Sequence, residues 1–81
     1  MNLSLLKAGH AAEIVEIKTE EGLEQRLQAL GFRPGREITL IRRAWFAGPL
    51  HVRIGTTEVM VRRREAEQIY LREISHKGEI A

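Results

Sequence analysis

The chain has 81 residues, of which 43% are hydrophobic and 30% are charged, and its 13 basic and 11 acidic residues leave a formal net charge of +2. One small domain fits this length, and so slight an excess of positive charge permits nucleic-acid binding without indicating it. The absence of cysteine excludes disulfides, thiolate metal ligands and a cysteine nucleophile.

The first elements predicted along the chain are a short turn and a strand. Leu3 and Leu6 are spaced to plug one end of a barrel, and Gly9 ends that turn. Residues 10–17 are strand-like, but their apolar side chains change face midway, from Ala12 and Ile14 to Val15 and Ile17. A β-bulge, or burial of both faces near one end, would reconcile this pattern.

Residues 19–36 predict one short helix with a defined start and stop. Thr19 is the expected N-cap, because its hydroxyl can accept a hydrogen bond from a free backbone N–H. Gly31 then occupies the C′ position of a Schellman stop, with Phe32 folding back onto the helix. The apolar stripe that faces the core is expected to consist of Leu23, Leu27 and Leu30.

The next residues predict a strand and a hairpin. Pro34 and Gly35 favour a type II turn, since proline presets φ and glycine supplies a positive φ. Residues 36–43 then alternate as a half-buried strand. Residues 50–61 alternate as a β-hairpin, and Gly55 at the first turn position favours type II′.

The remaining residues complete the predicted fold. Residues 64–69 can close one helical turn, and residues 70–74 supply a last strand. We therefore predict a mainly β protein with a short inserted helix, arranged as a small SH3-like, partly open β-barrel of about five strands. An OB-type barrel is the nearest alternative, but its strands are usually longer. We expect one domain over residues 1–74 and a flexible C-terminal tail over residues 75–81.

Neither membrane insertion nor catalysis is predicted. No apolar run approaches the ~18 residues that a transmembrane helix requires, and no signal peptide is visible, so we expect a cytoplasmic protein that is not membrane-embedded. The serines and threonines lack an obvious base partner, and no glycine-rich phosphate loop is present. We therefore expect no enzymatic activity.

Four segments carry a family resemblance. They are residues 3–9 (LSLLKAG), 26–35 (RLQALGFRPG), 48–55 (GPLHVRIG) and 62–69 (RRREAEQI). In order and spacing they resemble the ferrous-iron transport protein A (FeoA) family, and the resemblance covers about residues 3–74. One departure lies in residues 44–49: the family usually has Ala-Pro-x-Gly-Asp-Pro there, whereas this chain has AWFAGP.

The resemblance implies a cytoplasmic SH3-like accessory domain with no cofactor of its own. Its implied partner is FeoB, the membrane transporter of ferrous iron, whose cytoplasmic GTP-binding portion would recruit the domain to the inner face of the membrane. The domain would modulate assembly or transport, and no nucleic acid would take part. The alternative is an iron-linked regulatory or nucleic-acid-binding domain, because similar domains occur at the C-termini of iron-dependent repressors. The oligomeric state stays open.

The candidate metal ligands are few and scattered. They are His10, His51 and His76, with Glu13 and Glu58 as the accompanying carboxylates. None of the histidines shows a ligand spacing, so we favour solvated histidines with weak divalent-metal binding at most.

The aromatic pair gives the clearest signal for a binding surface. Two neighbours in an extended segment point opposite ways, so we expect one of Trp45 and Phe46 to be exposed. An exposed aromatic suggests a recognition surface for a partner, with Arg43 beside it. The alternative is that Trp45 caps the barrel end. Gly31, Pro34 and Gly35 are assigned to structural turns, and the arginines at 62–64 to solvated charge rather than a phosphate-binding face.

Overall fold

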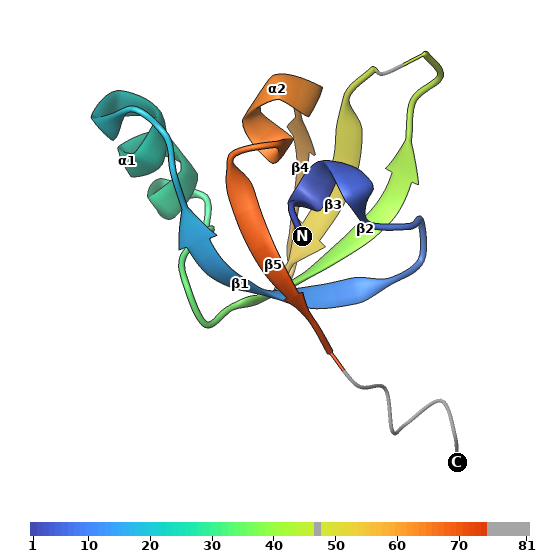
Figure 1. Ribbon diagram of the computed structural model, residues 1–81, viewed down its shortest axis with the longest axis horizontal. Coiled ribbons are helices and arrows are strands. Elements are labelled where there is room, and N and C mark those ends of the chain that lie inside the picture. The colour runs from blue at the N-terminus through green and yellow to red at the C-terminus, as the bar shows by residue number, and fades with distance from the viewer. Residues whose placement is uncertain (47, 75–81) are drawn as a thin grey trace.

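A computed structural model describes residues 1–46 and 48–74 of the chain. Five antiparallel strands form one open sheet in the order β4-β3-β2-β1-β5, and the sheet curls around a core in the manner of an SH3-like barrel (Figure 1). The predicted mainly β fold with a short inserted helix, here α1, is confirmed. The strands are β1 (Ala11–Ile17), β2 (Glu37–Arg43), β3 (Leu50–Ile54), β4 (Thr57–Val61) and β5 (Ile69–Glu73); the helices are η1 (Leu3–Leu5), α1 (Glu21–Ala29) and α2 (Arg63–Ala66).

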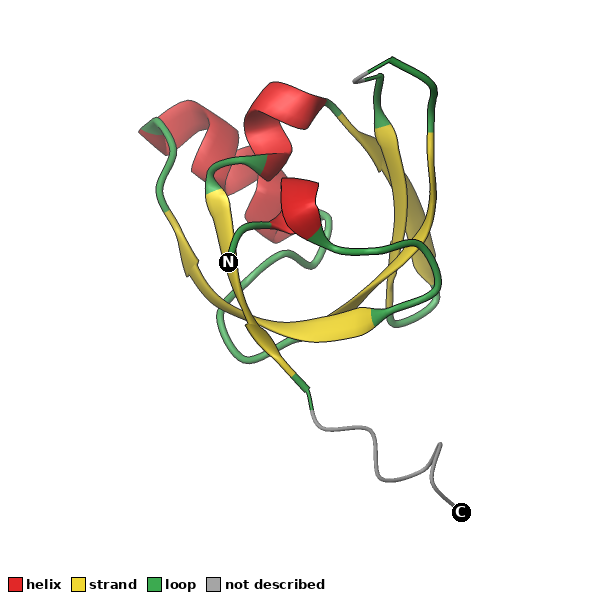
Figure 2. Ribbon diagram, turned by 45° about the vertical axis from the view of Figure 1, so that its right-hand side comes forward, coloured by secondary structure: helices red, strands yellow, loops and turns green. Residues whose placement is uncertain are grey.

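The helices lie over the open side of the curled sheet, as Figure 2 shows. In the described part of the chain, no helix is long and apolar enough to cross a membrane. The tail that we expect over residues 75–81 lies outside the described residues.

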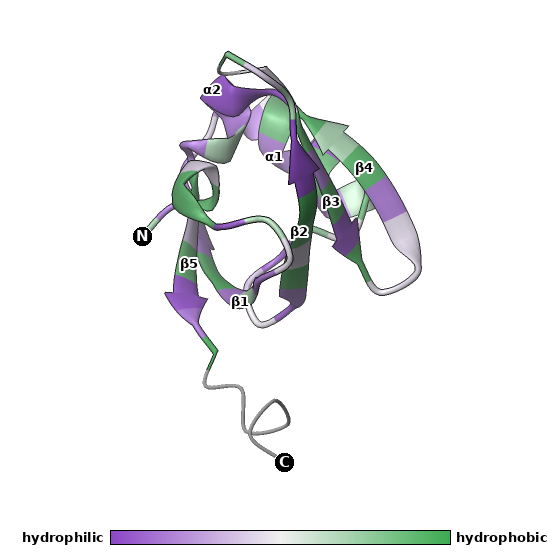
Figure 3. Ribbon diagram, turned by 90° about the vertical axis from the view of Figure 1, so that its right-hand side faces the viewer, coloured by the Kyte–Doolittle hydropathy of each residue, from purple (hydrophilic) through white to green (hydrophobic). Residues whose placement is uncertain are grey.

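The core is built from the inward-facing side chains of the strands, and Figure 3 shows this alternation of hydrophobic and hydrophilic residues along the ribbon. Phe32 is the largest fully buried side chain. Full burial of one Leu, Ile or Phe side chain contributes roughly 1.5–3 kcal/mol, so this cluster provides most of the driving force for folding. Its strand members include Ile14, Ile38, Leu40, Leu50, Val52, Ile54, Val61, Ile69 and Leu71.

The N-terminal segment closes one end of the barrel, as predicted. Leu3 and Leu6 are buried in the core. The Leu71 N–H donates to the Met1 carbonyl at 2.6 Å, and an isolated bridge joins Asn2 to Tyr70. The first residues therefore seal the core and also cover the outer edge of β5.

Two β-bulges bend the sheet. The β1–β5 register shifts between Ile14 and Glu16, which leaves Val15 as the extra residue, 45% exposed. This confirms the bulge predicted from the change of apolar face. A second shift, between Leu40 and Arg42, interrupts the β2–β3 ladder. Because bulges increase local twist, they help a sheet of short strands to curl around its core.

The start of α1 differs from the prediction. The N-cap is Glu20, not Thr19, because Glu20 is still extended (φ −61°, ψ 153°) and the helix begins one residue later. The Thr19 hydroxyl donates to the Glu20 carbonyl at 3.1 Å instead of accepting from the helix. The free N–H groups of the first turn therefore have no side-chain cap.

The predicted apolar stripe of α1 is also only partly correct. Leu27 is 2% exposed and Leu23 is half-buried, but Leu30 is 37% exposed. Leu30 fails to reach the core because it is the C-cap residue, beyond the last helical turn. The chain reverses there, and Phe32 takes the buried position that the 3.6-residue period assigned to Leu30.

The helix stop and the following turn are confirmed. The Phe32 N–H donates to the Leu27 carbonyl at 2.9 Å and the Gly31 N–H to the Gln28 carbonyl at 3.0 Å, the two bonds of a Schellman motif. Gly31 has φ +102°. The Arg36 N–H then donates to the Arg33 carbonyl at 3.2 Å across Pro34-Gly35, and Gly35 has φ +94°, as a type II turn requires.

We predict that Gly31→Val lowers the free energy of unfolding by about 1–3 kcal/mol, because a β-branched residue is strained at positive φ. Urea denaturation followed by circular dichroism measures this. An unchanged midpoint would show that the Schellman stop does not constrain the fold.

Gly22→Ala is the matched control in the same helix. Gly22 does not have a positive φ, and a Cβ added there meets nothing within 4 Å. We expect this change to raise the free energy of unfolding by about 0.4–1 kcal/mol, because alanine restricts the unfolded chain at no cost to the native state.

Candidate functional site

The candidate site is the connection between β2 and β3, which projects from one end of the sheet (Figure 1). The Ala44 N–H donates to the Pro49 carbonyl at 3.0 Å, and the Gly48 N–H donates to the Trp45 carbonyl at 3.1 Å. These two bonds close a tight turn with Trp45 and Phe46 at its tip. We call this segment, defined by Trp45, Phe46 and the closing residues Ala44, Gly48 and Pro49, the aromatic turn.

The backbone of the aromatic turn is strained. Phe46 has φ +54° and is the one non-glycine residue with a positive φ in the described ranges 1–46 and 48–74. A non-glycine residue in this region costs roughly 1–3 kcal/mol. Gly48 is also constrained, because a Cβ there would lie 2.8 Å from the Ala44 Cβ. The turn therefore holds one particular conformation at a local energetic cost.

Both aromatic side chains are exposed, Trp45 to 85% and Phe46 to 94%. Their ring centroids are 6.2 Å apart, with the planes tilted by 44°. We expected one exposed ring on the basis of an extended segment, but in a tight turn neighbouring side chains need not point to opposite faces. The alternative that Trp45 caps the barrel is wrong, because a capping side chain would be buried and Trp45 is exposed.

Arg43 contributes to the base of the turn rather than to its tip. Its Nη2 donates a hydrogen bond to the Leu6 carbonyl, which joins the end of β2 to the N-terminal segment. Its neighbour Arg42 is exposed. The structure thus places the predicted trio of Trp45, Phe46 and Arg43 together, with the two rings outward and the guanidinium bonded internally.

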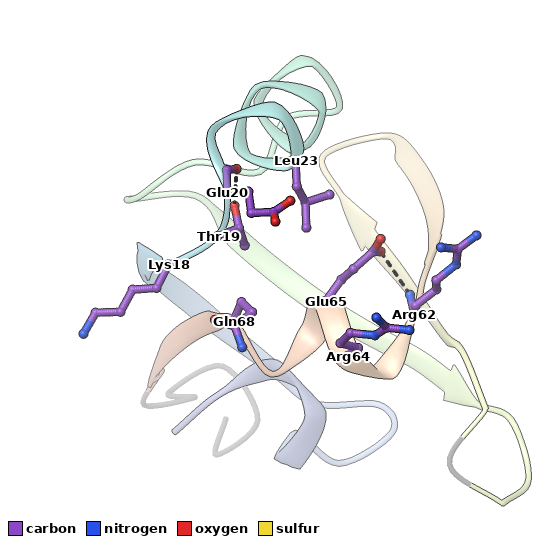
Figure 4. Close-up of a pocket in the computed structure, with 8 residues that line it drawn as sticks. All are labelled: Lys18, Thr19, Glu20, Leu23, Arg62, Arg64, Glu65 and Gln68. Atoms are coloured by element: carbon purple, nitrogen blue, oxygen red, sulfur yellow. Dashed lines mark hydrogen bonds between the residues drawn. The ribbon is translucent and has the colours of Figure 1, made fainter.

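The sequence analysis did not predict the groove that lies between α1 and α2. It is open, with a volume of about 460 Å³, and in Figure 4 Leu23 extends into it from α1. Glu65 accepts hydrogen bonds there from the Arg62 N–H at 3.3 Å and from Arg26 at 3.0 Å. Its lining comes from two segments that are distant in the sequence: Lys18, Thr19, Glu20 and Leu23 in the first, and Arg62, Arg64, Glu65 and Gln68 in the second.

The candidate metal ligands do not converge. His10 is exposed before β1, and His76 lies outside the described residues. His51 Nε2 lies 2.9 Å from Glu58 Oε1 across β3 and β4. Nowhere in residues 1–46 and 48–74 do three or more His, Cys, Asp or Glu side chains gather as a metal would require.

The other candidate carboxylate, Glu13, is paired with Arg72 across β1 and β5. The hydrogen bond to Glu13, and secondarily its negative charge, raise the pKa of the Arg72 guanidinium. Glu13 therefore stabilises a surface ion pair rather than contributing to a metal site.

We predict only weak divalent-metal binding, because His51 and Glu58 together provide two ligands where a structural site normally needs four. Calorimetric titration of the monomer with Fe²⁺ under anaerobic conditions measures this. A stoichiometric, submicromolar isotherm that disappears in His51→Asn would contradict it.

We also predict that Phe46→Gly leaves the free energy of unfolding unchanged or raises it by up to about 1 kcal/mol, because glycine tolerates positive φ and the exposed ring adds no packing. Phe46→Val, which keeps the strain, is the control and is expected to be less stable than Phe46→Gly. The reverse order of thermal midpoints would mean that Phe46 is not strained.

Comparison with known proteins agrees with this geometry. The profile of the FeoA domain matches residues 1–73, and a search of curated proteins finds no match. The FeoA protein of Chlorobium tepidum is 32% identical, with a TM-score of 0.88 over 95% of this chain and 73% of that one. Iron(II) transport protein A of Clostridium thermocellum is also 32% identical, with a TM-score of 0.86 over 91% of this chain but only 46% of its own length.

Two further structures extend the comparison. The zinc-complexed FeoA of Stenotrophomonas maltophilia, described as an SH3 domain protein, is 26% identical, with a TM-score of 0.74 over 89% of each chain. A manganese-dependent transcriptional repressor shares the fold alone, at 17% identity and a TM-score of 0.83 over 91% of this chain and 41% of that one. Because the FeoA profile spans nearly the whole described chain, this protein belongs to the FeoA domain family.

Proposed function

We propose that this protein is a small non-catalytic cytoplasmic accessory protein of ferrous-iron uptake. It docks on the cytoplasmic part of the FeoB transporter and modulates its assembly or transport. The observation that carries the proposal is the aromatic turn: two large apolar side chains are held outward on a strained backbone. Their exposure does nothing for the fold, whereas exposed rigid aromatics are typical anchors of intermolecular contacts.

The relatives support a role in iron transport. The Clostridium thermocellum protein is named for iron(II) transport, and the Stenotrophomonas maltophilia protein is described in terms of ferrous iron transport activation. This chain spans about half of the former and nearly nine-tenths of the latter. We extend that role to this chain together with its proposed partner.

A non-catalytic mechanism is supported by the arrangement of charges. In the described part of the chain, several carboxylates are taken up by surface ion pairs, among them Glu65 with Arg26 at 3.0 Å and Glu67 with Arg63 at 3.6 Å. The His51–Glu58 pair lies on the outside of the sheet rather than in the groove beside α2. Modulation by contact needs none of these groups to act as an acid or a base.

A regulatory, DNA-contacting role is the second candidate. It is favoured by the arginines at 62–64 and by the fold shared with the manganese-dependent repressor. Fold likeness alone carries little functional weight, so we rank it below transport.

We predict that Trp45→Ala and Phe46→Ala stay folded but lose binding to FeoB and no longer support ferrous-iron uptake. Binding is measured on lipid nanodiscs that contain the transporter, against empty nanodiscs of the same lipid, and uptake by complementation of a strain that lacks the protein. Met60→Ala, which removes another apolar side chain, 59% exposed, is the matched control and is expected to behave as wild type.

Equal binding of wild type to empty and transporter-containing nanodiscs would contradict docking on FeoB.

Arg43→Glu is expected to weaken binding in a salt-dependent manner if its charge faces an acidic partner surface. Loss of DNA binding in Arg62→Glu or Arg63→Glu, with both aromatic variants silent, would favour the regulatory role.

A further inference from the structure

We propose that the aromatic turn inserts into the interfacial region of an anionic lipid bilayer, with the arginines at the same end of the domain against the lipid headgroups. This inference rests on the proposed function in one respect: it needs the protein to work at a membrane. It names lipid as a contact of Trp45 and Phe46 beside the transporter on which the protein docks.

The shape of the turn suits insertion into lipid. A stable protein contact buries roughly 800 Å² on each partner, and its aromatic anchors sit within a wider surface that excludes water. Here the two rings stand on a narrow projection whose closing residues include the small Ala44 and Gly48. Two exposed rings on a projecting turn suit the headgroup region, where Trp is enriched and where Phe inserts readily.

The charge at this end of the domain complements an anionic surface. Arg42 and Arg43 end β2 at the base of the turn, and α2 lies at the same end of the molecule in Figures 1 and 3. Arg62, Arg63 and Arg64 cap and begin α2. The nearby carboxylates Glu65 and Glu67 pair with Arg26 and Arg63, and Glu20 lines the same groove as Arg62 and Arg64. Among the described residues, Arg42, Arg62 and Arg64 take part in none of the ion pairs and are available to anionic headgroups.

The strained backbone fits the same role. The Ala44–Pro49 and Gly48–Trp45 hydrogen bonds hold the tip in place before any contact is made. A preorganised turn loses little conformational entropy on insertion. This role explains the energetic cost at Phe46, because the strained conformation keeps both rings directed away from the domain.

Trp45 is the single tryptophan of the chain and reports on its own environment. Wild-type protein is mixed with phosphatidylcholine vesicles that contain or lack phosphatidylglycerol, without transporter. We expect a blue shift of Trp45 emission, protection from acrylamide quenching, and co-sedimentation with the anionic vesicles only. Added salt should weaken the binding without abolishing the shift of the bound fraction.

Matched variants separate the two contributions. Phe46→Ser keeps the fluorophore and should weaken partitioning roughly tenfold, whereas Val15→Thr, at an exposed apolar position on β1, should not. The double variant Arg42→Gln/Arg64→Gln should lose most binding to anionic vesicles. Its control, Arg36→Gln/Arg53→Gln, removes the same charge near the opposite ends of β2 and β3 and should retain binding.

Three outcomes would overturn the inference. They are no co-sedimentation with anionic vesicles at low salt, co-sedimentation without a change in Trp45 emission, and an emission shift seen only with transporter-containing nanodiscs. The last outcome assigns the turn to a protein pocket and leaves docking on FeoB intact. Conversely, binding to empty anionic vesicles that the transporter does not increase would support lipid insertion and contradict the proposed docking.

Discussion

The reversal of the chain after α1 is the constraint on which the rest of the structure depends. The two Schellman bonds at Gly31 and Phe32 end the helix and bring Phe32, the largest fully buried side chain, into a small core. The Gly35 N–H then donates to the Ile14 carbonyl at 2.7 Å, and the Ile14 N–H donates to the Arg36 carbonyl at 2.9 Å. The residues from Gly31 to Arg36 therefore fix the end of α1, the turn that follows it and the pairing of β1 with the start of β2. In a domain of this size, little additional burial is available to offset an error there.

Because the domain is small, the strained backbone of the aromatic turn indicates a functional role. A small domain tolerates local strain only where the surrounding structure holds it, and backbone strain clusters at functional sites. The strand ends and the Arg43–Leu6 bond hold the base of the turn, while the tip presents its rings to the surroundings. The N-terminal segment is linked to the site in this way, because it closes the barrel and also accepts the bond from Arg43. The fold thus provides a rigid support for the two exposed rings.

The aromatic turn, in the connection between β2 and β3, lies apart from the core of the barrel. The four segments that resemble the FeoA family build the turns and core contacts of the barrel, including the Leu3, Gly31 and Gly55 positions. Trp45 and Phe46 lie between the second and third of these segments. A fold can stay constant while a surface connection changes, because connections carry few of the contacts that stabilise the core. The surface chemistry of this member can therefore differ from that of relatives with the same barrel.

The sequence by itself determined the elements whose signals are local. Alternation predicted β2 and the β3–β4 hairpin, the face change in residues 10–17 predicted a bulge, and Gly31 and Pro34-Gly35 predicted two turns, because each depends on neighbouring residues and backbone sterics alone. Tertiary structure decided what depends on distant segments. Periodicity assigned Leu30 to the core, but the reversal of the chain gave that position to Phe32. The Arg43 bond to Leu6 and the groove between α1 and α2 join residues far apart in the chain, so they arise only when the sheet closes.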